Sequence, residues 1–426
     1  MHKKEIRNPW IWVPSLYLAE GLPYVVVMTV SVIMYKRLNI SNTDIALYTS
    51  WLYLPWVIKP LWSPIVDLLK TKRIWILLMQ FCIGSGLAGV ALTIPADDYF
   101  KYTLAFFWLI AFSSATNDIA ADGFYMLALD DHQQSWFVGV RNTFYRIAFI
   151  SGQGLFVIFA GQLEESTGDI SFSWLITFLI LALLFIFFLI YHIFILPYPL
   201  TDGKRKDVNL NSLVSDFLKT FSEFFKKKQI LLILAFILFY RFGEAQLVKM
   251  ASPFLLDPID SGGLALSTSQ VGFVYGTVGV IALTLGGLLG GFAAAKHGLK
   301  FWLWWMVIAI NLPDLAYILL SMTQTSNFLL INISVAIEQF GYGFGFTAFL
   351  LYLIYISEGN FKTSHYAIAT GFMALGMMLP GMFSGWLQES IGYKYFFIWV
   401  MISTIPAFII TKFIPLDAKF GIKKAT

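Results

Sequence analysis

An octet that occurs twice decides the fold: GQLEESTG at residues 161–168 and GWLQESIG at residues 385–392. Five of the eight positions are identical, and the two copies begin 224 residues apart (161 to 385). The same offset relates Glu20 to Glu244. A repeat at this spacing in a chain of 426 residues indicates two consecutive halves built on one plan.

The composition around both octets is that of a membrane protein. The chain is 58% hydrophobic and 13% charged, with a mean hydropathy of +0.72, whereas a soluble domain is about 25% charged. The single cysteine, Cys82, allows no internal disulfide, and no GxxxxGK(S/T) phosphate loop occurs. No histidine falls near the middle of an apolar run. We therefore expect an all-α polytopic membrane protein with no cofactor, no bound metal and no nucleic-acid partner.

The apolar runs predict twelve membrane spans, since a span needs about 20 mostly apolar residues. The polar segment 200–228 divides them six and six, and its VSDFLKTFSEFF portion (214–225) has the apolar spacing of a surface helix. We expect an N-terminal six-helix half (1–199), a cytoplasmic linker with an amphipathic helix (200–228) and a C-terminal six-helix half (229–426), which is the plan of the major facilitator fold. The spans are 10–34, 45–66, 74–95, 102–128, 137–162, 173–199, 229–256, 268–294, 301–322, 327–356, 366–387 and 395–414.

Lysine and arginine predict the orientation. With the N-terminus inside, 21 of the 29 basic residues lie on the inner side, four lie in outer loops and four lie within spans. Basic residues gather on the cytoplasmic side of membrane proteins. Both termini are therefore expected in the cytoplasm, and we expect a monomeric multi-pass protein.

The segment SSATNDIAADG (113–123) places two carboxylates, Asp118 and Asp122, on one helix face within an apolar run. A charge near the bilayer centre costs on the order of 3 kcal/mol, so such residues commonly mark transport pathways. An alternative is that they form structural ion pairs, for example Asp122 with Lys59 or Arg146. Ten ionisable residues fall within the spans. The candidates for proton coupling are Asp118, Asp122, Glu20, Glu244 and Glu338; the others are Asp314, Lys59, Arg146, Arg241 and Lys249. Sodium is the alternative coupling ion, because the same carboxylates can bind it.

Two further groups of residues have the chemistry of a carrier. Guanidinium groups bind anionic substrates through paired donors, and deep aromatic rings can stack on sugars. The candidates for substrate binding are Arg146, Arg241, Lys59, Tyr145, Tyr240, Tyr275, Tyr342 and Trp56. The stretch SPIVDLLKTKR (63–73) suggests a cytoplasmic gate, for which the candidates are Asp67, Lys70, Arg73 and Arg141. A solvated acid at a helix end is the alternative for Asp67.

Several stretches in both halves resemble the AmpG-like muropeptide permeases of the peptide–acetyl-coenzyme A–drug transporter family, within the major facilitator superfamily. They are EGLP (20–23), KPLWSPIVD (59–67), SATNDIAAD (114–122), YRIAF (145–149), YRFGEA (240–245) and IEQFGYGFGFTAF (337–349). The resemblance implies a proton symporter that works by alternating access in the inner membrane. It also implies a cargo of N-acetylglucosaminyl-anhydro-muramic acid, with or without stem peptide, recovered in peptidoglycan recycling.

Two alternatives stay open from the sequence. The first is a carrier of the same fold for another cargo: an amino sugar, a peptide, a siderophore or acetyl-coenzyme A. The second is an integral-membrane transferase, with His132 or the Asp130–Asp131 pair as its catalytic group near the interface. The repeat and the charges within the spans count against the transferase, so we expect no enzyme activity.

Overall fold

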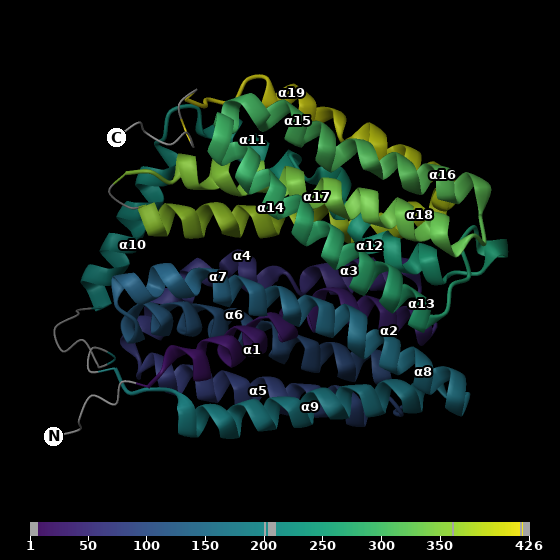
Figure 1. Ribbon diagram of the computed structural model, residues 1–426, viewed down its shortest axis with the longest axis horizontal. Coiled ribbons are helices and arrows are strands. Elements are labelled where there is room, and N and C mark those ends of the chain that lie inside the picture. The colour runs from purple at the N-terminus through teal and green to yellow at the C-terminus, as the bar shows by residue number, and fades with distance from the viewer. Residues whose placement is uncertain (1–6, 200–201, 203–209, 360–361, 418–419, 421–426) are drawn as a thin grey trace. The chain divides into compact units, whose positions relative to one another are not determined.

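The computed structural model describes residues 7–199, 202, 210–359, 362–417 and 420 (Figure 1). The described residues form helices joined by short connections, with no strand among them. They divide into two compact units, Met1–Leu38 with Leu61–Leu213, and Asn39–Pro60 with Val214–Thr426. Residues 39–60 belong to the predicted N-terminal half (1–199), but in the structure they group with the second unit.

In the first unit α5 packs against α6 and α9, and α1 packs against α6 and α7. Figure 1 shows α5 and α9 lying side by side. Its α-helices are α1 (Val13–Val25), α2 (Ser31–Arg37), α5 (Lys72–Thr93), α6 (Tyr99–Ala128), α7 (Asp131–Phe149), α8 (Val157–Thr167) and α9 (Ile170–Ile195). A 3-10 turn (Pro9–Ile11) and two π-helical segments (Val26–Val30 and Ile150–Phe156) belong to it as well.

In the second unit α17 packs against α14 and α15, and α18 packs against α3 and α12. Two helices, α4 (Leu54–Leu68) and α10 (Leu210–Phe225), begin in one unit and end in the other. The rest are α3 (Asn42–Trp51), α11 (Ile230–Phe239), α12 (Phe242–Leu256), α13 (Thr268–Val271), α14 (Val280–His297), α15 (Leu299–Asn311), α16 (Leu315–Thr323), α17 (Phe328–Ile356), α18 (Lys362–Ser403) and α19 (Ile405–Thr411). Two 3-10 turns (Ile259–Ser261 and Leu312–Asp314) and one π-helical segment (Gly272–Gly279) complete it.

Ten helical runs among the described residues are long and apolar enough to cross a membrane. The predicted span 45–66 is not among them, and its residues form two helices, α3 and α4, separated by Leu52 and Tyr53. The predicted spans 366–387 and 395–414 fall in a single run, Ser364–Thr411. That run holds two helices joined at Gly392, whose φ of 75° is a left-handed conformation that glycine adopts without strain. An all-α membrane fold is confirmed, and the count of twelve stays a prediction.

The glycine-rich run QFGYGFG (339–345) brings α17 into contact with the backbones of two neighbouring helices. A Cβ atom at Gly343 would lie 2.0 Å from the carbonyl oxygen of Leu283 in α14. A Cβ atom at Gly341 would lie 2.0 Å from the carbonyl oxygen of Ala309 in α15. Small residues allow such close helix contacts in membranes, so these glycines determine how the second unit packs.

Each octet holds a buried polar contact. In the first, Glu164 accepts hydrogen bonds from Arg37 at 3.0 Å and from the indole of Trp174 at 2.9 Å. In the second, Gln388 occupies the same octet position and accepts a hydrogen bond from Asn42 at 2.6 Å. Arg37 and Asn42 flank the connection where the chain passes from the first unit to the second. Each octet therefore anchors one side of that connection.

Asn42 is expected to stabilise the second unit through its buried hydrogen bonds. Its amide also donates to Tyr393 at 3.0 Å and to Asp257 at 3.3 Å. The Asn42→Leu variant leaves these oxygens without that donor, which should lower the free energy of unfolding by about 2 kcal/mol. Thermal unfolding of the purified protein in detergent measures this loss.

The matched control is Asn332→Leu. The Asn332 amide donates to the carbonyl oxygen of Phe328 in its own helix, so we expect a smaller change. An equal effect of both substitutions would contradict a special role for Asn42.

Candidate functional site

An ion pair between Asp122 and Arg141 lies at the centre of the first candidate site. The Arg141 guanidinium is 3.1 Å from Asp122 Oδ1 and 3.1 Å from the Tyr17 hydroxyl, which itself donates to Asp122 at 3.2 Å. The same guanidinium lies 4.8 Å from the centre of the Tyr17 ring and 5.2 Å from that of Tyr125. Helices α1, α6 and α7 of the first unit thus meet at one carboxylate.

Glu20 adds a third carboxyl group to this cluster. It lies three residues after Tyr17 on the same face of α1, and its side chain is 6% exposed. Its carboxyl group interacts with the charges of both Asp118 and Asp122. Asp118 and Asp122 are both partly exposed. The cluster therefore combines one buried acid with two accessible ones.

The remaining candidates in the first unit lie on α7. Tyr145 and Arg146 are half-buried, and the Tyr145 ring packs on Phe149 with ring centres 5.3 Å apart. A Cβ atom at Gly21 of α1 would lie 3.1 Å from the Tyr145 carbonyl oxygen. Close contact between α1 and α7 thus places Tyr145 beside the acidic cluster.

The proposed gate residues lie in three different settings. Arg73 is buried and donates to the carbonyl oxygens of Ile193 and Leu196 at the end of α9, where a cation is favoured by the helix dipole. Arg141 pairs with Asp122, as described above. Lys70 is exposed at a left-handed backbone position (φ 66°). The side chain of Asp67 lies outside the described residues.

In the second unit Arg241 forms an aromatic-lined cation site. Its guanidinium donates to the Tyr342 hydroxyl and lies 4.6 Å from the centre of the Phe346 ring. Tyr240 lies next to it in sequence but in the hydrophobic core, where it is fully buried and donates to the Gly345 carbonyl at 2.9 Å. Phe236 and Phe349 pack on its ring, so Tyr240 is a packing residue in this structure.

A second basic residue of this unit, Lys249, is buried within it. Its ammonium donates to the Thr49 hydroxyl at 2.9 Å and lies over the Tyr53 ring. Trp56 and Lys59, which precede the point where α4 leaves this unit, are half-buried. Lys249 thus lies on α12, and Trp56 and Lys59 lie on α4.

Three acids of the second unit, Glu244, Asp314 and Glu338, lie together. Each is at most 1% exposed, and oxygens of the three carboxylates lie within 4.8 Å of one another. Glu338 accepts hydrogen bonds from Gln339 at 3.1 and 3.0 Å, and Gln339 also donates to Tyr275 at 3.4 Å. The structure therefore brings Glu244 and Glu338, which were predicted as site residues, together with Asp314, which was not.

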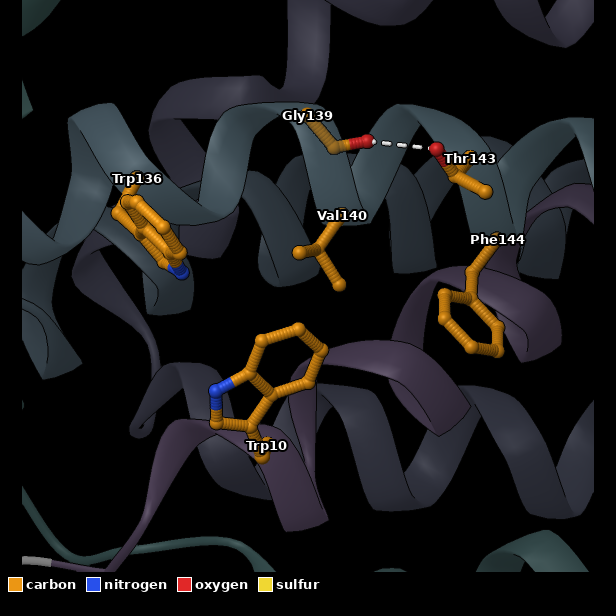
Figure 2. Close-up of a pocket in the computed structure, with 6 residues that line it drawn as sticks. All are labelled: Trp10, Trp136, Gly139, Val140, Thr143 and Phe144. Atoms are coloured by element: carbon orange, nitrogen blue, oxygen red, sulfur yellow. Dashed lines mark hydrogen bonds between the residues drawn. The ribbon is translucent and has the colours of Figure 1, made fainter.

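A shallow apolar pocket of about 430 Å³ lies in the first unit, between Trp10 and α7. Figure 2 shows the Trp10 ring facing Val140 and Phe144 of α7, with Trp136 beside it. The side chains of Trp10 and Trp136 are more than half exposed. Exposed tryptophans near a helix end are typical of the membrane interface, so we attribute this pocket to lipid contact.

Sequence reasoning missed Tyr17, Asp314 and Tyr317 as site residues. Tyr17 could have been found, because its spacing of three from Glu20 places both on one helix face. Asp314 was visible as a carboxylate within a span. Tyr317 carried no signal, since one more tyrosine among 20 is unremarkable until its neighbours are known.

The Asp122–Arg141 pair should contribute modestly to stability. The Asp122 side chain is 41% exposed and that of Arg141 is 27% exposed, so solvent screens their attraction. A double-mutant cycle with Asp122→Asn and Arg141→Met should give a coupling of about 0.5–1 kcal/mol in thermal unfolding. The exposed Asp98–Lys101 pair is the control and should show no measurable coupling. A coupling near zero for both pairs would contradict the assigned contact.

The fold and these charged clusters define a polytopic membrane transporter. The Major Facilitator Superfamily model matches residues 15–360, and the chain belongs to that family. It is 27% identical over 414 residues to a putative transporter AmpG 4 of Rickettsia conorii, covering 94% of each chain. It is 25% identical over 402 residues to the anhydromuropeptide permease of Escherichia coli K12, covering 93% of this chain and 77% of that protein.

The fold is also that of solved transporters. A crystal structure of the nucleoside transporter NupG superposes with a TM-score of 0.72 at 16% identity, covering 95% of this chain and 99% of that one. Because the identity is low, the match concerns the fold alone. Together with the family match it confirms a transporter, and no enzyme of the kind weighed above.

Proposed function

We propose that the protein imports N-acetylglucosaminyl-anhydro-muramic acid and related anhydromuropeptides, coupled to protons, across the bacterial inner membrane. The observation that carries the cargo is the relationship to the anhydromuropeptide permease, which extends over 93% of this chain. Anhydromuropeptides are sugar acids, and Arg146 and Arg241 offer guanidinium groups suited to carboxylates. We propose that a single chain transports the cargo by alternating access, as secondary carriers do.

The proton is assigned to the acids of the first unit. Asp122 is held by Arg141 and Tyr17, and we assign it the role of anchor in the cluster. The charges of Asp118 and Glu20 act on each other. Neighbouring carboxyl groups are most stable when they share one proton. We therefore assign proton coupling to Asp118 together with Glu20.

Uptake into proteoliposomes tests the cargo. Purified protein is reconstituted, and radiolabelled N-acetylglucosaminyl-anhydro-muramic acid is added outside, with and without an imposed inward proton gradient. We expect accumulation only with the gradient. Uptake of a nucleoside, a dipeptide and a free amino sugar is measured in parallel. Weak uptake of these compounds would show that the protein prefers the muropeptide over other cargoes of the same carrier fold. Well-folded protein that moves none of the muropeptide would overturn the proposed cargo.

A further inference from the structure

The acidic cluster formed by Glu244, Asp314 and Glu338 brings three carboxylates together from three elements. Glu244 lies in the first turn of α12, Asp314 ends the 3-10 turn after α15, and Glu338 lies within α17. All three are buried, and each offers an oxygen within 4.8 Å of the others. Such a grouping is costly unless a positive charge or protons are present.

Protein donors satisfy only part of this cluster. Glu338 accepts two hydrogen bonds from Gln339, whereas both oxygens of Glu244 and both oxygens of Asp314 are buried without a hydrogen-bond partner. Arg241 acts on Glu244 through its charge, although its guanidinium donates to Tyr342. Lys249 donates to Thr49. Among the described residues, Arg241 is thus the cation that acts on this cluster, and it acts on Glu244 alone.

Neutral oxygens lie beside the acids. The Tyr317 hydroxyl is fully buried beside all three carboxylates, and no hydrogen bond of good geometry satisfies it. The Oδ1 atom of Asn311, one turn before Asp314, is also buried without a partner. Carboxylates combined with neutral oxygens are the ligand set of hard metal cations such as Ca²⁺. The unsatisfied oxygens of Glu244, Asp314 and Asn311 match that ligand set, and the Tyr317 oxygen can complete it.

We propose that Glu244, Asp314 and Glu338 form a binding site for a metal cation with oxygen ligands, to which Tyr317 contributes its hydroxyl. This departs from the expectation from sequence that no metal is bound. Three ionised carboxylates and Arg241 leave two negative charges, which one Ca²⁺ neutralises. One Na⁺ neutralises them when a carboxyl group keeps a proton. All residues of the site belong to the second unit, and ion binding can be measured without any cargo.

Ion binding to the purified full-length protein tests the site. ²²Na⁺ and ⁴⁵Ca²⁺ are titrated separately in a scintillation proximity assay, and thermal unfolding is followed in parallel. We expect saturable binding of one of the two ions and an unfolding temperature raised by roughly 5 °C at saturation. Asp314→Asn and Glu244→Gln should lose both effects. Glu164→Gln, which neutralises a buried acid of the first unit outside the proposed coupling and cargo residues, is the matched control and should keep them.

Stability without ions separates lost binding from misfolding. In ion-free buffer the Asp314→Asn variant should unfold at a higher temperature than the native protein, because it removes a buried repulsion. Native protein that binds neither ion, or whose stability responds to pH alone, would overturn the proposal. Binding that persists in both variants would overturn it as well. Neither result depends on transport of the cargo. The uptake assay therefore tests the proposed cargo independently of the ion site.

Discussion

The Asp118→Asn variant is expected to lose accumulation of the cargo against its gradient while it still exchanges cargo across the membrane. An amide cannot bind and release the proton that the Glu20–Asp118 pair shares in our proposal. A gradient of one pH unit corresponds to about 1.4 kcal/mol and supports roughly tenfold accumulation for each coupled proton. The native protein should approach that ratio, and the variant should stop at equal concentrations on both sides.

The measurement compares two assays on the same proteoliposomes. Accumulation is followed under an imposed proton gradient, and exchange is followed as counterflow of labelled against unlabelled cargo without a gradient. Asp97→Asn, which changes an exposed acid between α5 and α6, should behave as the native protein in both. An Asp118→Asn variant that still accumulates cargo above the outside concentration would remove this residue from the coupling step. Loss of counterflow as well would indicate a binding defect instead.

The sequence predicted the elements of this fold well because their signals are local. The apolar runs in both halves are long enough to indicate spans. The interruption between α3 and α4 also carried a signal, because Pro55 lies in the first turn of α4 and proline favours a helix start. That signal was not used when the span 45–66 was predicted.

The candidate sites were harder to predict than the helices. Helical spacing placed Asp118 and Asp122 on one face, but the basic partner of Asp122 could not be read from depth alone. Arg141 of α7 pairs with Asp122 at 3.1 Å. The sequence analysis instead gave Lys59 and Arg146 as possible partners. The acidic cluster of the second unit needs three elements to converge on one point. Long-range convergence of this kind has no periodic signature in a single sequence.

The Gly343→Ala variant should lower the free energy of unfolding by about 3 kcal/mol, since overpacking a tight contact costs this much. The added Cβ atom would lie 2.0 Å from the Leu283 carbonyl oxygen and 3.0 Å from the Gly287 amide nitrogen, both in the backbone of α14. Backbone atoms cannot rotate away as a flexible side chain would, so α14 and α17 must separate.

Thermal unfolding and size-exclusion chromatography of the detergent-solubilised protein measure this loss. The matched control is Gly291→Ala in α14, where an added Cβ atom meets nothing within 4 Å. Alanine favours a helix over glycine by up to about 1 kcal/mol, so Gly291→Ala should be neutral or stabilising. If Gly343→Ala unfolded at the native temperature but transported more slowly, the glycine would serve motion of α17 rather than its packing. The 2.0 Å approach to α14 favours packing, because a helix held this closely by backbone contacts has little freedom to bend.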